Sequence, residues 1–247
     1  MITPKVTIVS VTYNNISGLR RTANSVLTQT FGEFEWLVID GASSDGTVEF
    51  CRLLGPACLC ISEPDNGIYD AMRKGLEKAS GAYVVFLNAG DELAGPNALG
   101  EAVEHLDGAN VVFFSTLIRG FGGDRLRRPR PLSAATYSVP AIQQSTFYNV
   151  EILRGLQWPV DYKICGDYFL AAQLLRQGCT HRSIPKVVSI FALGGVSTGS
   201  FLRLASEAWA VQDQVLGLGL PVRITSACRR VLTGLAVLVT FSVLGRR

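Results

Sequence analysis

Polar side chains, mostly carboxylates and amides, follow four short apolar runs in the first 92 residues. They are Tyr13 with Asn14, Asp40, Glu63 with Asp65, and the group Asn88–Glu92. A fold that aligns the ends of these runs would collect the polar groups in one crevice. Such groups accept hydrogen bonds from a ribose or a base, and carboxylate oxygens are hard ligands for a divalent cation.

The loop Asp40–Thr47 has the sequence DGASSDGT. Gly41 and Gly46 permit a tight backbone, and Ser44 or Asp45 can cap the helix expected to follow. A capped turn accounts for Asp45 but gives Asp40 no structural task. Asp40 is therefore a candidate acceptor of hydrogen bonds from a nucleotide.

Two adjacent acids, Asp91 and Glu92, come shortly after the apolar run Tyr83–Leu87. An oxygen ligand at this place would suit Mg²⁺ or Mn²⁺ bridging a diphosphate. The alternative is an N-cap for a helix beginning near Asn97. Asp91 lies too far before that helix to cap it directly, so the pattern favours a metal ligand.

The segments that carry these residues alternate between strand and helix patterns. We expect strands at Lys5–Thr12, Trp36–Ile39, Leu59–Ser62 and Tyr83–Leu87, and helices at Gly18–Thr30, Thr47–Leu54 and Tyr69–Ala79. Right-handed crossovers turn this βαβαβαβ order into an open, mostly parallel α/β sheet with helices on both faces. Ligands of such sheets bind at the carboxyl ends of the strands, where the polar groups are expected.

Composition and missing motifs exclude several other classes. Of the 247 residues, 48% are hydrophobic and 17% are charged, so the chain can bury a core and is not disordered. The sequence contains neither GxGxxG nor the P-loop pattern, and its six cysteines form no CxxC pair. No nucleic-acid-binding module is recognisable, so we expect no nucleic-acid partner.

Six segments together resemble the inverting glycosyltransferases of family 2. They are TIVSVTYNN, DGASSDGT, SEPDNGIYDAMRKG, FLNAGDE, QQSTFY and CGDYFLAAQLL. The resemblance covers about residues 4–200 and extends to bacterial enzymes that assemble colanic acid, capsule or O-antigen repeat units. It implies the GT-A nucleotide-sugar fold over residues 1–220, with a nucleotide-sugar half at 1–115 and an acceptor half at 116–220.

The resemblance also implies roles for individual residues. Contacts with the nucleotide-sugar donor would come from Thr12, Tyr13, Asn14, Asp40, Asp45, Asp65, Arg73 and Asn88, although Arg73 could instead face solvent. Family members commonly carry DxD after the fourth strand, where this chain has Asn88, Ala89 and Gly90 before Asp91. Asp91 would then be the ligand of Mg²⁺ or Mn²⁺. A saccharide or lipid-linked saccharide acceptor would lie near Gln144, Ser145 and Gly195.

Asp167 in the segment CGDY matches the acidic motif that supplies the catalytic base in this family. A base is needed because the acceptor hydroxyl must lose its proton as it attacks the anomeric carbon. The alternative is that Asp167 caps the helix expected at Tyr168–Arg176. The two roles are compatible.

Arginines concentrate in two parts of the sequence. The segment Ile118–Pro131 contains five arginines against one acid, Asp124, and five more arginines follow Asp213 with no acid among them. A solvated hairpin edge would explain the first group. The alternative is that these arginines contact a lipid diphosphate acceptor.

Residues 221–247 form a basic and apolar tail. Within it, Val231–Leu244 holds only apolar and small residues with three threonines or serines, between two pairs of arginines. A helix of roughly 14 residues is about 21 Å long, short of the ~30 Å hydrocarbon core. We therefore expect the tail to lie on the membrane surface. With no signal peptide before the first strand, that surface would be the cytoplasmic face of the inner membrane.

Two other functions stay open beside sugar transfer. One is a non-catalytic nucleotide-sugar or partner-binding protein, which the missing DxD makes conceivable. The other is a sugar nucleotidyltransferase, although such enzymes normally have a Gly- and Lys-rich amino-terminal loop where this chain has TYNNISG.

Overall fold

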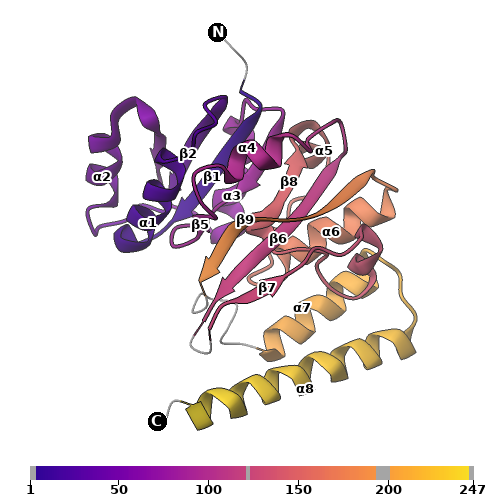
Figure 1. Cartoon of the computed structure of the whole chain (residues 1–247). Coiled ribbons are helices and arrows are strands. Elements are labelled where there is room, and N and C mark those ends of the chain that lie inside the picture. Colours follow the sequence, from indigo (N-terminus) through magenta and orange to yellow (C-terminus); the bar gives the residue numbers. More distant parts are fainter. Residues whose placement is uncertain (1–3, 121–122, 193–200, 245–247) are drawn as a thin grey trace.

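The computed structural model describes residues 4–120, 123–192 and 201–244, and only the backbone of Ala192, Phe201 and residues 233–244. Within these residues nine strands form one sheet in the order β3-β2-β1-β4-β8-β6-β9-β5, and β7 pairs with β6 (Figure 1). The strands are β1 Val6–Thr12, β2 Phe34–Asp40, β3 Leu59–Ser62, β4 Tyr83–Phe86, β5 Glu92–Leu93, β6 Val111–Arg119, β7 Arg125–Arg127, β8 Thr146–Asn149 and β9 His181–Ala192.

The helices connect and cover these strands. They are α1 Ile16–Leu27, α2 Thr47–Leu54, α3 Ile68–Lys78, α4 Ala98–Val103, α5 Val150–Arg154, α6 Gly166–Arg176, α7 Phe201–Gln214 and α8 Leu220–Leu244, with short 3₁₀ turns η1 Gly55–Ala57, η2 Leu132–Thr136 and η3 Gln143–Ser145. The α/β architecture and the first seven expected elements are confirmed. Their bounds differ from the expected ones by no more than a few residues.

The sheet is parallel in its first half and mixed in its second. Strands β3, β2, β1 and β4 are parallel, as expected from the βαβ pattern. Strand β8 then runs antiparallel to both β4 and β6, while β9 returns parallel to β6. The arginine-rich segment forms the antiparallel β6–β7 hairpin, which confirms a hairpin at that place.

Alternating side chains of the central strands feed two cores, one on each face of the sheet. In β1, Val9 and Val11 join the core under α3, whereas Val6 and Ile8 join the core under α1 and α4. A strand buried on both faces needs a nearly continuous apolar run, which explains the sequence VTIVSVT.

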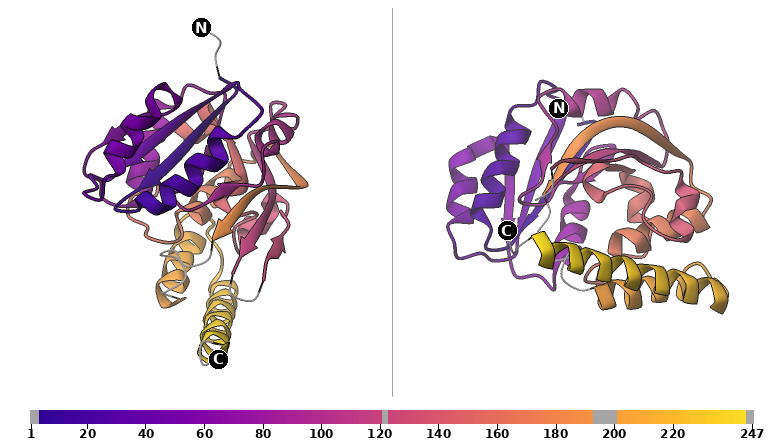
Figure 2. Two further views of the ribbon diagram at one scale, coloured as in Figure 1. Left: turned by 60° about the vertical axis from the view of Figure 1, so that its left-hand side comes forward. Right: turned by 60° about the horizontal axis from the view of Figure 1, so that its bottom comes forward.

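A third apolar cluster joins α6 to α7 and includes Phe169, Ala172, Ala208 and Val211. Helix α8 packs next to α7, where the Arg223 guanidinium stacks on Trp209 and Gln212 donates to the Ser226 hydroxyl at 2.8 Å. The helix runs along the edge of the molecule (Figures 1 and 2).

The tail helix is longer than the sequence indicated. It begins at Leu220 and not at Val231, because the residues before Val231 have packing partners on α7. No helix in the part of the chain that the structure describes is long and apolar enough to cross a membrane.

Candidate active site

The ends of the parallel strands are held at one edge by the register of the sheet. Thr12 lies opposite Asp40, and Asp40 lies opposite Ser62 on the next strand. On the other side of β1 the backbone N–H of Ala89 donates to the Val11 carbonyl, so the turn after β4 stays beside the end of β1. The loops expected to lie together at this edge of the sheet therefore do so.

Asp40 is fully buried and its carboxylate is already bonded within the protein. It accepts from the Ser43 N–H at 2.9 Å, the Ser43 hydroxyl at 2.5 Å and the Ser62 hydroxyl at 2.6 Å. These bonds fold the loop after β2 and join it to β3. Asp40 thus shapes the crevice from beneath.

Asp45 joins the loops that precede α1 and α2. Its carboxylate accepts from the Thr47 hydroxyl at 2.6 Å and from the Ile16 N–H at 2.8 Å, and these bonds lower its pKa. The two loops are also joined through Asn14, whose side-chain oxygen accepts from the Ser44 N–H at 2.9 Å. Asp45 and Asn14 therefore hold the loops before α1 and α2 together.

The side chains of Tyr13 and Asp65 both lie close to Gly41. Tyr13 is 66% exposed, and a Cβ at residue 41 would stand 2.7 Å from Asp65 Oδ2 and 3.3 Å from the Tyr13 ring. A side chain at residue 41 would therefore displace the Asp65 carboxylate. An exposed ring beside a carboxylate is suited to stacking a nucleobase and accepting its N–H or a ribose hydroxyl.

Two polar atoms at this edge are buried without a hydrogen-bond partner among the described residues, the Thr12 hydroxyl and Asn88 Oδ1. Buried polar atoms in folded proteins almost always have a partner, so an orphan pair at the ends of adjacent strands indicates a place for a polar ligand. Both residues were expected to contact the donor.

Asp91 is buried in the turn after β4 and accepts from Gln144 Nε2 at 2.7 Å. The turn is fixed by Thr22, whose hydroxyl donates to the Asp91 carbonyl and accepts from the Gly90 N–H. Among the described residues no group of three His, Cys, Asp or Glu side chains could hold a metal. Asp91 and Asn88 share one tight turn, in which the Asp91 N–H donates to the Asn88 carbonyl at 2.9 Å. A divalent ion at this turn would take most of its ligands from phosphates and water.

Gln144 and Ser145 were both expected near the acceptor, but they occupy different environments. Gln144 reaches Asp91 and so lies at the site. Ser145 is fully buried, and its hydroxyl bonds to Thr116 at 2.8 Å and to Ser189 at 2.6 Å. Ser145 therefore anchors η3 between β6 and β9 and can affect an acceptor only through the placement of Gln144.

Arg73 forms ion pairs on α3 with Asp70, at 2.8 Å, and with Glu77. The Arg73 guanidinium lowers the pKa of Asp70, and the Arg73 side chain is 38% exposed. This placement gives Arg73 a role in α3 itself. Gly195 lies outside the described residues.

Asp167 lies in the first turn of α6, partly buried against Tyr69 and Tyr148. Burial raises its pKa to about 6, although the bond from the Tyr168 N–H and the charge of Arg230 oppose this shift. Gly166 permits the approach, because a Cβ there would overlap the Tyr69 ring. A carboxylate with this pKa can accept a proton near neutral pH.

The segment that leads into α6 is bonded to Glu207 of α7. The Glu207 carboxylate accepts from three successive backbone N–H groups, Lys163 at 3.1 Å and Ile164 and Cys165 at 2.9 Å. Asp167 itself accepts from the Tyr168 N–H at 2.7 Å within the first turn of α6, so the capping role considered from the sequence stays compatible with the role of a base.

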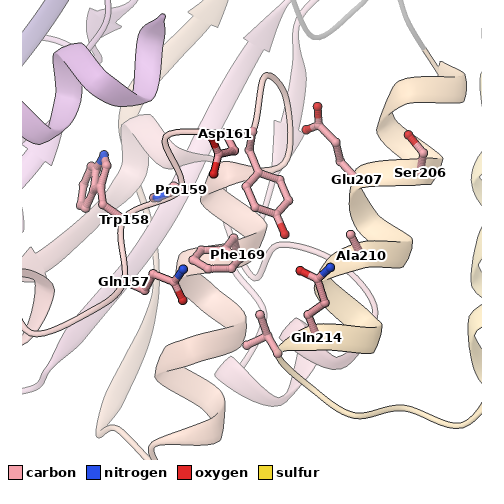
Figure 3. A pocket seen from close by; sticks show the side chains of 11 residues that line it. Gln157, Trp158, Pro159, Asp161, Phe169, Ser206, Glu207, Ala210 and Gln214 are labelled. Atoms are coloured by element: carbon pink, nitrogen blue, oxygen red, sulfur yellow. The ribbon is translucent and has the colours of Figure 1, made fainter. Parts of the chain in front are cut away.

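Behind α6, a cavity of about 390 Å³ lies between the Gln157–Tyr162 loop and α7 (Figure 3). Glu207 points toward this loop, and Asp161 and Phe169 also line the cavity. Lys163 in the same loop donates from Nζ to the Asn66 carbonyl at 3.1 Å, which connects the Asp167 region to the loop that carries Asp65. No residue pattern in the sequence marks Glu207 or Lys163, since their partners are distant or are backbone groups.

The sheet, the crevice at its carboxyl edge and the half-buried acid on α6 define a GT-A glycosyltransferase fold. Among solved structures, a mannosyltransferase from Pyrobaculum calidifontis in complex with GDP-Man and Mn²⁺ aligns over 99% of this chain and 81% of its own, with a TM-score of 0.68 and 18% identity. TarS residues 1–349 of S. aureus, in complex with UDP-GlcNAc, aligns over 86% and 71% with a TM-score of 0.67 and 15% identity.

The family model described as "Glycosyl transferase family 2" matches residues 7–175, and the chain belongs to this family. An uncharacterized glycosyltransferase of Mycobacterium tuberculosis is 34% identical over 197 residues, which are 73% of each chain. A PGL/p-HBAD biosynthesis glycosyltransferase of the same organism is 34% identical over 97 residues, 38% of each chain. The protein is thus a glycosyltransferase, as the resemblance implied.

Replacing Glu207 with Gln should destabilise the start of α6. Glutamine keeps one accepting oxygen and loses the charge, so the free energy of unfolding should fall by about 1.5–3 kcal/mol in urea denaturation. The neighbouring exposed Ser206→Ala is the control and should change it by less than about 0.5 kcal/mol. Equal stability of the two variants would contradict the role of Glu207 in holding the segment before α6.

Proposed function

We propose that this enzyme inverts the anomeric centre while it transfers a sugar from a nucleoside diphosphate donor to a saccharide or lipid-linked saccharide. The observation that carries the proposal is that Asp167 is partly buried and has a raised pKa. The same fold also gathers polar side chains at the carboxyl edge of its parallel strands. The family and the solved structures that contain UDP-GlcNAc and GDP-Man with Mn²⁺ support a nucleotide-sugar donor. A role in bacterial surface polysaccharide synthesis follows from the motif resemblance.

The proposed binding of the donor uses the residues of the crevice. Tyr13 stacks the base, Asp65 accepts hydrogen bonds from the nucleoside, and Thr12 and Asn88 supply the polar atoms that have no partner within the described chain. Asp40, Asp45 and Asn14 hold these loops in shape. A divalent ion held by Asp91 and Asn88 would stabilise the negative charge of the departing diphosphate.

In the proposed reaction, Asp167 removes the proton of one acceptor hydroxyl. The hydroxyl oxygen forms a bond to the anomeric carbon from the face opposite the diphosphate. The bond from that carbon to the diphosphate oxygen breaks, and the nucleoside diphosphate leaves with the electron pair. The proton stays on Asp167 until the product departs, and water then takes it up.

The proposed metal site predicts that nucleotide binding depends on a divalent ion. Calorimetry should show UDP binding at least about tenfold tighter with Mn²⁺ than with EDTA, and Asp91→Ala should abolish this difference. Glu92→Gln is the control, because Glu92 pairs with Arg119 at 3.4 Å on the other side of the turn. The same UDP affinity in Mn²⁺ and EDTA would exclude the metal role.

The proposed base predicts a large loss of turnover with little change in donor affinity. Asp167→Asn should lower kcat by about 10² to 10⁴, the usual contribution of general base catalysis, while UDP binding stays within about twofold. The exposed Asp161→Asn is the matched control and should retain activity.

The pH dependence provides a second readout for Asp167. Because a base must be ionised, kcat/KM of the wild type should rise with pH and level off above a midpoint of about 6. The residual activity of Asp167→Asn should lack this rise. Wild-type activity in this variant would transfer the role to another acid.

We further propose that the end of α8 lies on the cytoplasmic surface of the membrane. The arginines beside Val231–Leu244 would favour anionic headgroups, and the segment itself is apolar. A chain ending at Leu232 retains the contacts of Arg223 and Ser226 with α7, so it should still fold. In cell fractionation the full chain should pellet with membranes and the shortened chain should not. Equal distribution of the two would exclude the membrane role.

A further inference from the structure

Arginines from two distant parts of the chain meet around the segment Tyr137–Val139. Arg130, which follows β7, donates to the Val139 carbonyl at 2.7 Å and to the Ser138 hydroxyl, and Arg127 of β7 donates to the same carbonyl at 3.5 Å. Arg230 of α8 donates to the Tyr137 carbonyl. From the sequence, these arginines were predicted to lie in two separate places, a hairpin edge and the tail.

Arg229 of α8 belongs to the same group, because its charge and that of Arg127 act on Arg130. Burial lowers the pKa of Arg130, and the charges of these two neighbours lower it further. We call Arg127, Arg130, Arg229 and Arg230 the arginine cluster. The positive charges of Arg127 and Arg229 act unfavourably on that of Arg130.

No carboxylate in the described part of the chain forms an ion pair with Arg127, Arg130 or Arg230. The Nε–H groups of these three arginines are also buried without a hydrogen-bond acceptor among the described residues. Neutral carbonyls hold the guanidinium groups in place but do not compensate their charge. Buried charges in proteins are normally paired.

The cluster adjoins the proposed catalytic base. The Arg230 guanidinium stacks on the ring of Tyr168, 5.2 Å from its centroid, and Tyr168 directly follows Asp167. The charge of Arg230 also acts on the Asp167 carboxylate. A ligand that places a hydroxyl at Asp167 can therefore extend toward the cluster.

We propose that the arginine cluster is an anion site that binds a phosphate group of the acceptor while the acceptor hydroxyl lies at Asp167. Planar guanidinium groups bind phosphate oxygens in pairs, and several cations together suit a multiply charged diphosphate. Only the assignment of the ligand as an acceptor rests on the proposed function. Anion binding by the cluster does not require sugar transfer.

The test measures anion binding directly on the full chain. Inorganic pyrophosphate is titrated by calorimetry in the presence of saturating UDP, which fills the donor site. Separately, sedimentation compares vesicles of phosphatidylglycerol with vesicles of phosphatidylcholine. The first probe represents a diphosphate on an acceptor, and the second represents the phosphate of a lipid headgroup.

The test variant is Arg127→Gln with Arg130→Gln. Its matched control is Arg20→Gln with Arg52→Gln, which removes the same charge from α1 and α2, where Arg20 stacks on Phe50 and Arg52 pairs with Glu49. A second pair, Arg127→Lys with Arg130→Lys, keeps the charge if the glutamine pair does not fold.

The variant with both arginines replaced by glutamine should bind pyrophosphate at least fivefold more weakly than the wild type, and its UDP affinity should stay within twofold. The control pair should lose less pyrophosphate affinity than this variant. The lysine pair should weaken pyrophosphate binding less, since it loses the planar groups but not the charge.

Weakened binding to phosphatidylglycerol with unchanged pyrophosphate binding would overturn the acceptor site in favour of a headgroup site. Equal binding by test and control variants would overturn the anion site. Absence of UDP binding in the wild type would contradict the proposed function and leave the pyrophosphate comparison valid.

Discussion

The hydrogen-bonded register of β1, β2 and β3 is the constraint on which the active site depends. Because Thr12, Asp40 and Ser62 stand side by side, the loops that follow them must share a small volume. Their backbones are correspondingly tight. Asn14 and Ala42 have positive φ angles, which non-glycine residues seldom adopt. The acids in these loops are used to hold this crowded arrangement as much as to bind a ligand.

The other half of the site depends on helices and not on strand register. Glu207 of α7 holds the segment just before α6, and Arg230 of α8 stacks on Tyr168 beside Asp167. The environment of Asp167 is therefore built by two helices that come later in the chain. This arrangement makes α8 part of the surroundings of the proposed base, although its far end extends beyond them.

The first half of the fold could be predicted from the sequence, because apolar periodicity depends on local residues and indicated βαβαβαβ directly. The antiparallel pairings of β8 with β4 and β6 join distant segments and have no such local signal. The polar strand ends were also predictable, since parallel strands must end at one edge. The functions of single acids were harder to predict. Asp40, chosen because it had no structural task, is bonded to Ser43 and Ser62, and Ser145 is enclosed by hydroxyls of two other strands. The partners of Glu207 lie about forty residues earlier and are backbone groups, so no residue pattern marks them.

The pairing of β5 determines when during synthesis the crevice can be completed. Strand β5 directly follows Asp91, and its ladder partners are Ile190 and Ser189 of β9, roughly one hundred residues later in the chain. While the ribosome is still making that stretch, β5 lacks its partner strand and the turn before it is held from one side only. Contacts between such distant residues form late and slow the folding of the whole domain. The nascent amino-terminal half is therefore expected to emerge with its sheet partly open, and to complete the candidate site only when β9 has been translated.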